Sequence, residues 1–316
     1  MRHLVVPALF LSFAAYPLQA AVDPALLDLA PRGTKVLMGV NAEQALQSSF
    51  GQFALSRIPE NNDLQQFIAA TGFDFRRDLR QILIASDGSS PAAASKTLVA
   101  VRGRFQPGKI MGIAGLSGAK SFNYNGITVV DFGAMNKQIS VGAFLDADTL
   151  ILGNDDVVKA AIDQHATGKH FDDVLAKRAD DASGQYDIWI TSEAPLSSLA
   201  PPQLGNFQGG AAGSALSSIL AVSAGIRFQS DGASLTGEAV AASSQDAQSI
   251  AGMAQLVLAL AQSSKTQGAQ QGAALLKSAR VFAEGSSVRM LLMIPEEQLE
   301  QMFNTPGARK VALPAR

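Results

Sequence analysis

The chain has 316 residues, of which 47% are apolar and only 16% are charged, and its formal net charge is −2. The basic residues are spread along the chain, so there is no basic field to attract nucleic acid or anionic lipid. The chain has no cysteine, which excludes disulfides, thiolate metal sites and lipid attachment through a cysteine. Its length allows two domains, each with its own core.

The N-terminus has the pattern of a secretory signal. Arg2 and His3 precede the apolar run LVVPALFLSFAAY, and small residues follow near Ala20 and Ala21. The apolar run contains a proline and is shorter than the roughly 20 residues of a membrane-spanning helix. We therefore expect a signal peptide at 1–20, cleavage after Ala20 or Ala21, and a periplasmic or secreted protein with no membrane span after cleavage.

The first half, 21–165, alternates short strands and helices. KVLMGV (35–40) predicts a strand that leads into Asn41, which with Gln44 can form a capping box at the start of a helix. A second helix is predicted from Asn62, and a short one from Pro107. The pair Asn125 and Gly126 predicts a tight hairpin. Strands are predicted at 80–86, 96–105, 121–124, 127–132, 139–145 and 149–153.

The stretch LGNDDVVKAAIDQ (152–164) resembles a phosphate-binding strand, glycine and helix start. However, Asp155 and Asp156 occupy the first turn, where they interact with the helix dipole and would repel a phosphate. Asp155 is also four residues before Lys159, in the favourable orientation for an ion pair. We therefore predict a capped helix, with the buried side made by Val157, Val158, Ala161 and Ile162.

The second half, 186–316, has a similar order of elements. Strands are predicted at 186–191, 219–229, 233–242, 279–283 and 288–294, with helices at 244–262 and from Pro295. Both halves end in a hairpin followed by a helix with an acidic start, which indicates a diverged internal duplication. The segment 166–185 is the predicted linker. The expected fold class is α+β, with two repeats of antiparallel sheet packed with helices, and the second half is ferredoxin-like in element order.

Two groups of residues could support chemistry. His165, His170, Asp172 and Asp173 have side chains that suit zinc, but they lie in the expected solvated linker without a regular spacing, so no metal is predicted. Ser117 and Lys120 have the S-x-x-K spacing of penicillin-binding enzymes, but the stretch reads as a turn and the companion motifs are missing. No catalytic residue and no cofactor are predicted.

The stretch FDFRRDLRQ (73–81) is the first candidate binding surface. Arg76, Arg77 and Arg80 could hold a phosphate or a peptide carboxylate. The alternative is that these arginines pair with Asp74 and Asp78 on an exposed turn, from which the aromatic side chains pack inward.

Two further candidates are apolar. Tyr186 and Trp189 stand in a predicted strand, where Trp189 is either an exposed aromatic contact for a ligand or part of the core. Val257 and Leu260 belong to the helix 244–262, which is apolar almost all round near its end. Such a helix is buried on both sides, forms a homodimer contact, or covers a hydrophobic ligand.

The segments GVNAEQALQSSFGQFALS and FIAATGFDFRRDLRQILIAS, followed by the paired closing hairpins, resemble a family of exported bacterial proteins without an assigned activity. The resemblance spans nearly the whole mature chain. It implies an exported α+β protein and supplies no catalytic residue.

Our leading hypothesis is a non-enzymatic protein that binds a protein, a peptide or an envelope component through sheet surfaces or the cleft between the halves. The alternatives are a carrier of a small hydrophobic ligand, with a pocket beneath the helix 244–262, and a serine hydrolase that uses Ser117 and Lys120 or a linker histidine.

Overall fold

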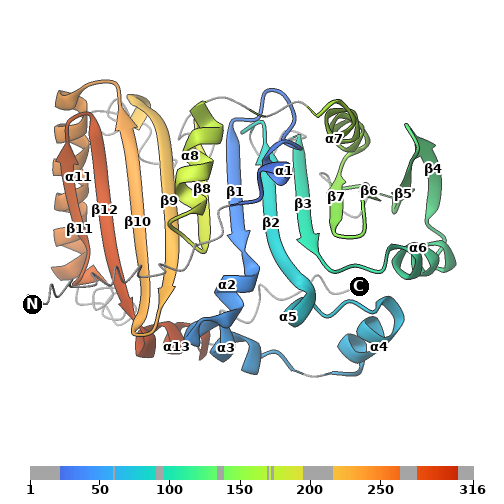
Figure 1. The fold of residues 1–316 in the computed structure, drawn as a ribbon. Helices are drawn as coiled ribbons and strands as arrows, with labels where there is room; N and C mark the ends of the chain where they lie inside the picture. The colour runs from blue at the N-terminus through green and yellow to red at the C-terminus, as the bar shows by residue number, and fades with distance from the viewer. Residues whose placement is uncertain are drawn as a thin grey trace, which may run out of the picture.

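The computed structural model describes residues 22–59, 61–89, 96–133, 139–168, 171, 174–194, 216–263 and 276–304. The described strands form one 12-stranded sheet in the order β11-β12-β10-β9-β8-β1-β2-β3-β7-β6-β5-β4 (Figure 1). Every pairing between them is antiparallel. The predicted α+β class with antiparallel sheet is confirmed. The likeness to a ferredoxin-like domain is limited to the order of elements along the chain, because split βαβ units contain parallel strands.

The strands agree closely with the predicted ones. They are β1 (Val36–Asn41), β2 (Leu79–Ser86), β3 (Thr97–Gly103), β4 (Lys120–Tyr124), β5 (Ile127–Asp131), β6 (Val141–Phe144), β7 (Thr149–Gly153), β8 (Ile188–Ser192), β9 (Ile219–Gln229), β10 (Gly232–Ala241), β11 (Arg280–Glu284) and β12 (Ser287–Pro295). The β4–β5 hairpin turns through Asn125 and Gly126, both at positive φ, as a primed two-residue turn requires.

Three helices, at 24–27, 75–78 and 174–183, were not predicted from the sequence. The described helices are α1 (Pro24–Leu27), α2 (Ala42–Gln47), α3 (Ser49–Ser56), α4 (Asn62–Thr71), α5 (Phe75–Asp78), α6 (Pro107–Leu116), α7 (Asp155–Thr167), α8 (Val174–Ser183), α11 (Ser244–Ser263) and α13 (Glu296–Asn304). The single helix expected after Asn41 is divided at Ser48, whose extended backbone ends α2 and whose hydroxyl caps α3. Pro295 ends β12, one residue before α13 begins.

The centre of the sheet is the pair β1 and β8. Outward from this pair, the strands follow β1, β2, β3, β7, β6 on one side and β8, β9, β10, β12, β11 on the other. The hairpin β4–β5 extends the first side. The two halves of the chain therefore share one continuous sheet.

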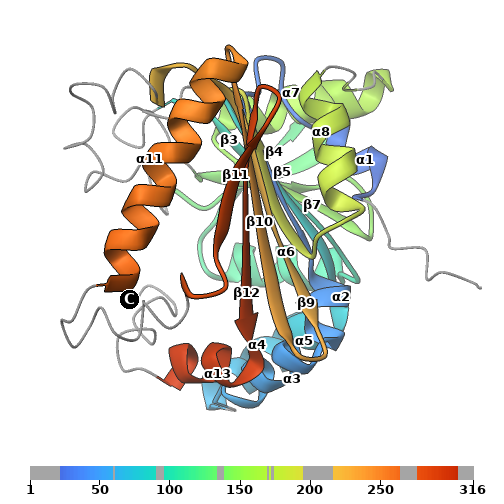
Figure 2. The same cartoon turned by 90° about the vertical axis from the view of Figure 1, so that its left-hand side faces the viewer.

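One face of the sheet carries α1, α7 and α8 (Figure 2). These helices bury the main core against the central strands, including Leu37, Leu83, Leu98 and Ile151. The segment 166–185, expected as a linker, contains α8, whose buried Leu175, Ala179 and Ala182 belong to this same core. α8 is thus a packed layer of the fold and not a solvated connection.

The opposite face carries α11 at one end of β9 to β12 and α3 with α13 at the other end. α11 buries Ala247, Ile250 and Ala251 against the sheet. Phe50 of α3 stacks on Phe228 of β9 with the ring centroids 5.2 Å apart. Within the described part of the chain, no helix is long and apolar enough to cross a membrane. The expected signal peptide, 1–20, lies outside the described residues.

Candidate binding groove

A groove of about 690 Å³ lies between α8 and the strands of the second half. It is on the same face of the sheet as the main core, but over β9, β10, β12 and β11, where no described helix covers the strands. The residues that line it are Val174, Lys177, Arg178, Asp181, Ala182, Gln185, Tyr186, Ser223, Ala224, Thr236, Glu238, Val240, Phe282, Ser287, Arg289 and Leu291.

Two periodicities place these side chains. The lining residues of α8 recur at helical spacing, so that Val174, Lys177, Arg178 and Asp181 share one side of the helix. The strands alternate, and the register places Ser223, Glu238, Arg289 and Phe282 side by side on neighbouring strands. The wall on α8 is therefore largely charged, and the floor is a mixed row of polar and apolar side chains.

The cations of the groove differ in their partners. The guanidinium of Arg289 contacts Glu284 at 2.9 Å and Glu238 at 3.8 Å. Neither Lys177 nor Arg178 forms an ion pair with a described residue, and the Nε of Arg178 is buried with no hydrogen-bond partner among these residues. The exposed Lys177 and the half-buried Arg178 thus carry positive charge without a carboxylate partner among these residues, so a carboxylate supplied by a ligand would be stabilised at this wall.

The groove also contains exposed apolar side chains. Phe282 is 38% exposed and Leu291 is 41% exposed, and both line the groove. Tyr186 lies directly against Gly225 of β9, where a Cβ would overlap its ring. The groove can therefore take an elongated ligand that combines carboxylates with apolar groups.

The arginines of FDFRRDLRQ are largely occupied by neighbouring carboxylates. Arg76 donates to both carboxylate oxygens of Asp74, at 2.9 Å from Nε and 2.8 Å from Nη2. Arg77 does the same to Asp78, at 2.8 and 2.7 Å. Arg80 lies in β2 and forms no ion pair within the described chain. The structure thus favours the paired alternative over a clamp for Arg76 and Arg77.

Of the two alternatives for Trp189, the structure shows the core position and corrects its place among the candidate binding residues. Trp189 is only 2% exposed and belongs to the main core. Its neighbours in alternation, Asp187 and Thr191, are polar but also buried, so they do not mark a wet face. Tyr186, the other member of this pair, does line the groove.

Val257 and Leu260 lie on the exposed part of α11, at 57% and 62% exposure. Gln255 and Gln262 of the same helix donate to the carbonyls of Val281 and Leu276. Val257 and Leu260 therefore project from the flank that faces away from β11. Neither residue lines a groove or pocket described in the structure.

The two residues of the S-x-x-K pattern are on different elements. Ser117 is the C-cap residue that follows α6, and Lys120 begins β4. The two residues are therefore not one turn apart on a helix, and no hydrogen bond joins them. Both border an open hollow of about 570 Å³ beside Phe132. The geometry that lets a lysine activate this serine is therefore missing.

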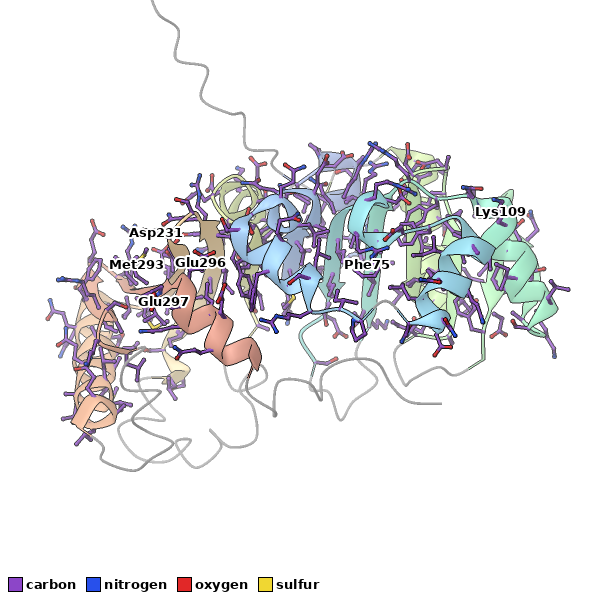
Figure 3. The ribbon with its side chains drawn as sticks, turned by 90° about the horizontal axis from the view of Figure 1, so that it is seen from below. Phe75, Lys109, Asp231, Met293, Glu296 and Glu297 are labelled. Atoms are coloured by element: carbon purple, nitrogen blue, oxygen red, sulfur yellow. The ribbon has the colours of Figure 1, made fainter. Side chains whose placement is uncertain are left out.

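The helix start after β7 is capped as predicted. The side chain of Asn154 accepts a hydrogen bond from the Val157 N–H at 3.0 Å, and Asp155 pairs with Lys159 at 2.6 Å. The predicted buried side is confirmed in all four positions. Figure 3 shows the corresponding acidic start of α13, where Glu296 and Glu297 lie near Asp231 of the β9–β10 turn.

The metal candidate cannot be assembled from the described residues. His165 lies exposed in the last turn of α7, whereas His170, Asp172 and Asp173 lie outside the described residues. Within the described ranges, no group of three histidine or carboxylate side chains could hold a metal ion.

The sequence reading missed Lys177, Arg178, Glu238, Arg289, Phe282 and Leu291. A signal existed in the helical spacing of 174, 177, 178 and 181, but it lay in the segment assigned to the linker. The strand residues carried only an ordinary alternation of polar and apolar side chains.

No protein-family model matches the chain, and no curated protein is similar to it in sequence. Among solved structures, it is similar to crystal form III of TP0453, with a TM-score of 0.51 and 12% identity over 89% of this chain and 97% of that chain. Crystal form IV gives a TM-score of 0.49 and 11% identity over 92% and 99%. At this identity the likeness concerns the fold alone.

Proposed function

We propose that the protein is an exported, non-enzymatic binding protein that holds an extended, acidic polypeptide segment of a partner in the groove between α8 and the strands β9 to β12. The observation that carries this proposal is the pair of cations on α8, Lys177 and Arg178, which form no ion pair with a described residue and face a floor with exposed Phe282 and Leu291. An extended chain presents alternate side chains to opposite sides. One row can therefore meet the charged wall while the other contacts the apolar floor.

The proposal can be tested with synthetic peptides of defined pattern. Fluorescein-labelled octapeptides that alternate glutamate with leucine, lysine with leucine, or serine with glycine are titrated with the mature protein, and fluorescence anisotropy is measured. We expect the glutamate peptide to bind most tightly, since it supplies both carboxylates and apolar groups. Equal affinity for the glutamate and lysine peptides would exclude an acidic ligand.

Variants locate the binding site on the chain. Arg178→Gln and Phe282→Ala should each weaken binding of the glutamate peptide about tenfold, the effect of losing one central contact. Phe67→Ala is the matched control, because Phe67 is an exposed aromatic on α4, outside the groove. If all three variants bind alike, the peptide occupies another surface. Crosslinking in the native envelope, followed by mass spectrometry, would then identify the physiological partner.

A carrier of a small hydrophobic ligand is the second candidate, and an apolar belt on the opposite face of the sheet favours it. Two neighbouring rows across five central strands contain only half-buried apolar residues. The rows are Ile190, Met38, Ile84, Val99 and Leu152, and Ile188, Val40, Ile82, Val101 and Leu150. Lipids extracted from protein purified from its native envelope, without detergent, test this candidate. A lipid-free protein that also fails to bind a fluorescent fatty acid would exclude the carrier.

Export and internal duplication are further parts of the proposal. The matching strand orders outward from β1 and β8 support a duplication, and the pattern of residues 1–20 supports export. The N-terminal residue of the protein recovered from cell fractions tests export directly. We expect it to begin at Ala21 or Val22, in the periplasmic or secreted fraction.

A further inference from the structure

The two ends of the sheet are protected differently. At one end, the outer side of β11 is covered by α11, whose Gln255 side chain donates to the Val281 carbonyl at 2.8 Å. At the other end, β4 pairs only with β5 in the described sheet, and its first four residues are exposed. Open strand edges are templates for pairing with another chain, and proteins usually block them.

The turn of the β4–β5 hairpin determines which backbone groups face outward. In a two-residue hairpin, Tyr124 and Ile127 close the turn as a hydrogen-bonded pair, so Phe122 and Lys120 also direct their backbone groups to β5. The N–H and C=O groups of Ser121 and Asn123 therefore point away from the sheet. The same rule makes the Val281 carbonyl of β11 point outward, where Gln255 contacts it.

We propose that β4 is a homodimer edge, at which two copies of this chain pair antiparallel about a dyad through Phe122 and join their sheets. This arrangement places Ser121 opposite Asn123 of the second copy. Both residues direct their backbone groups outward, so the two chains can exchange four hydrogen bonds. Phe122 then faces its own symmetry mate, as an isologous interface requires.

Charge complementarity favours a second copy of this chain as the partner that pairs with the edge of β4. The dyad places Lys120 of one copy opposite Tyr124 of the other. The Tyr124 hydroxyl donates to Asp163 of α7 at 2.9 Å, and the Asn125 side chain donates to the same carboxylate at 2.7 Å. Asp163 forms no ion pair with a described residue. The Lys159 ammonium nearby lies 5.5 Å from the centre of the Tyr124 ring and pairs with Asp155. Lys120 of the second copy can therefore approach a carboxylate whose hydrogen-bond donors, Tyr124 and Asn125, are both neutral, twice per dimer.

The proposed interface is small, so the affinity between the two copies should be low. Pairing of two five-residue strands buries less than the roughly 1,200 Å² of a standard stable interface. Leu116, just before β4 in the chain, is 91% exposed, and α6 lies at the same end of the molecule (Figure 1). We expect a weak dimer, with a Kd on the order of 10 µM.

Sedimentation velocity of the mature protein from about 1 to 300 µM tests the dimer edge, over the range that brackets the expected Kd. Ser121→Pro removes one outward N–H and leaves the β4–β5 bonds intact, and proline is tolerated on strand edges. Ser121→Ala is the matched control because it retains the N–H. We expect Ser121→Pro to remain monomeric and Ser121→Ala to dimerise, with the same circular dichroism for both.

Charge reversal at Lys120 and Asp163 distinguishes a dimer through β4 from a dimer through another surface. Lys120→Glu and Asp163→Lys should each weaken the dimer at least tenfold, and the double variant should recover most of the affinity, because it restores both ion pairs. A monomer at all concentrations, a dimer unaffected by Ser121→Pro, or a double variant without recovery would each overturn the proposal. Peptide binding in the groove is measured separately and does not depend on this result.

Discussion

The indole ring of Trp189 in β8 lies directly against the backbone of Gly39 in β1. The two residues are register partners across the centre of the sheet, and a Cβ built on Gly39 would overlap the ring. The ring is 2% exposed and forms part of the core beneath α1, α7 and α8. The contact therefore joins the strand that starts each half of the chain.

Replacing Gly39 by alanine should destabilise the protein by about 1–3 kcal/mol, the usual cost of overpacking a core. The matched control is Gly237→Ala in β10, where the nearest atom to a new Cβ is Met290 Cε at an ordinary 3.7 Å. Urea unfolding followed by fluorescence measures both, and Trp189 is the only tryptophan of the chain. Equal unfolding midpoints for the two variants would contradict the close contact.

The cap of α7 gives a second prediction. Asn154→Ala removes the acceptor of the Val157 N–H and should cost about 1 kcal/mol, as is typical for this position. Asn154→Asp keeps an acceptor and adds a favourable charge at the helix start, so it should retain the wild-type stability. Thermal unfolding of the two variants distinguishes them. A stable alanine variant would show that the cap contributes little here.

Some features of this fold can be predicted from the sequence, and others cannot. The cap at Asn154 and the turn at Asn125 depend on a few adjacent residues, so their signals are local and were recognised. α8 was missed because its buried side consists of Leu175 and mostly alanines, which give a weak apolar stripe. The groove depends on how α8 packs against β9 to β12, which are distant in the sequence, and no local pattern encodes that.

For Trp189, the sequence leaves two alternatives open. Its alternation with Asp187 and Thr191 suggested a polar, wet face. In the structure, both polar side chains are buried with hydrogen-bond partners: Asp187 accepts from the Phe228 N–H at 2.7 Å, and Thr191 contacts Ser223 at 3.2 Å. A polar residue type indicates exposure only when no partner is available inside the fold.

The arginine-rich turn predicts a loss of stability in acid. Asp78 is buried, and the hydrogen bonds from Arg77, the largest influence, lower its pKa. A carboxyl whose folded pKa is below the unfolded value stabilises the protein above about pH 4, and the contribution is lost as the pH falls through the folded pKa. Asp78→Asn should therefore unfold at lower urea than the wild type at pH 7, and this difference should narrow below pH 3.

The control for this prediction is Asp63→Asn, since Asp63 is an exposed carboxylate in the first turn of α4 that forms no ion pair with a described residue. It should change the urea midpoint little at either pH. If Asp78→Asn keeps its full deficit in acid, the loss comes from packing and not from the charge.

Asp187 predicts the opposite dependence on pH. Its carboxylate is 1% exposed, one of its oxygens has no partner among the described residues, and burial raises its pKa. Because the folded protein then binds the proton more tightly than the unfolded chain, stability decreases as the pH rises from about 4 through the folded pKa.

Asp187→Asn keeps an acceptor for the Phe228 N–H without the buried charge. It should be more stable than the wild type at pH 8, with a difference that vanishes near pH 4. Asp187→Ala, which leaves that N–H unpaired, should cost about 1–3 kcal/mol. Urea midpoints between pH 4 and 8 measure all three proteins, and a wild type that gains stability with rising pH relative to Asp187→Asn would contradict the assignment.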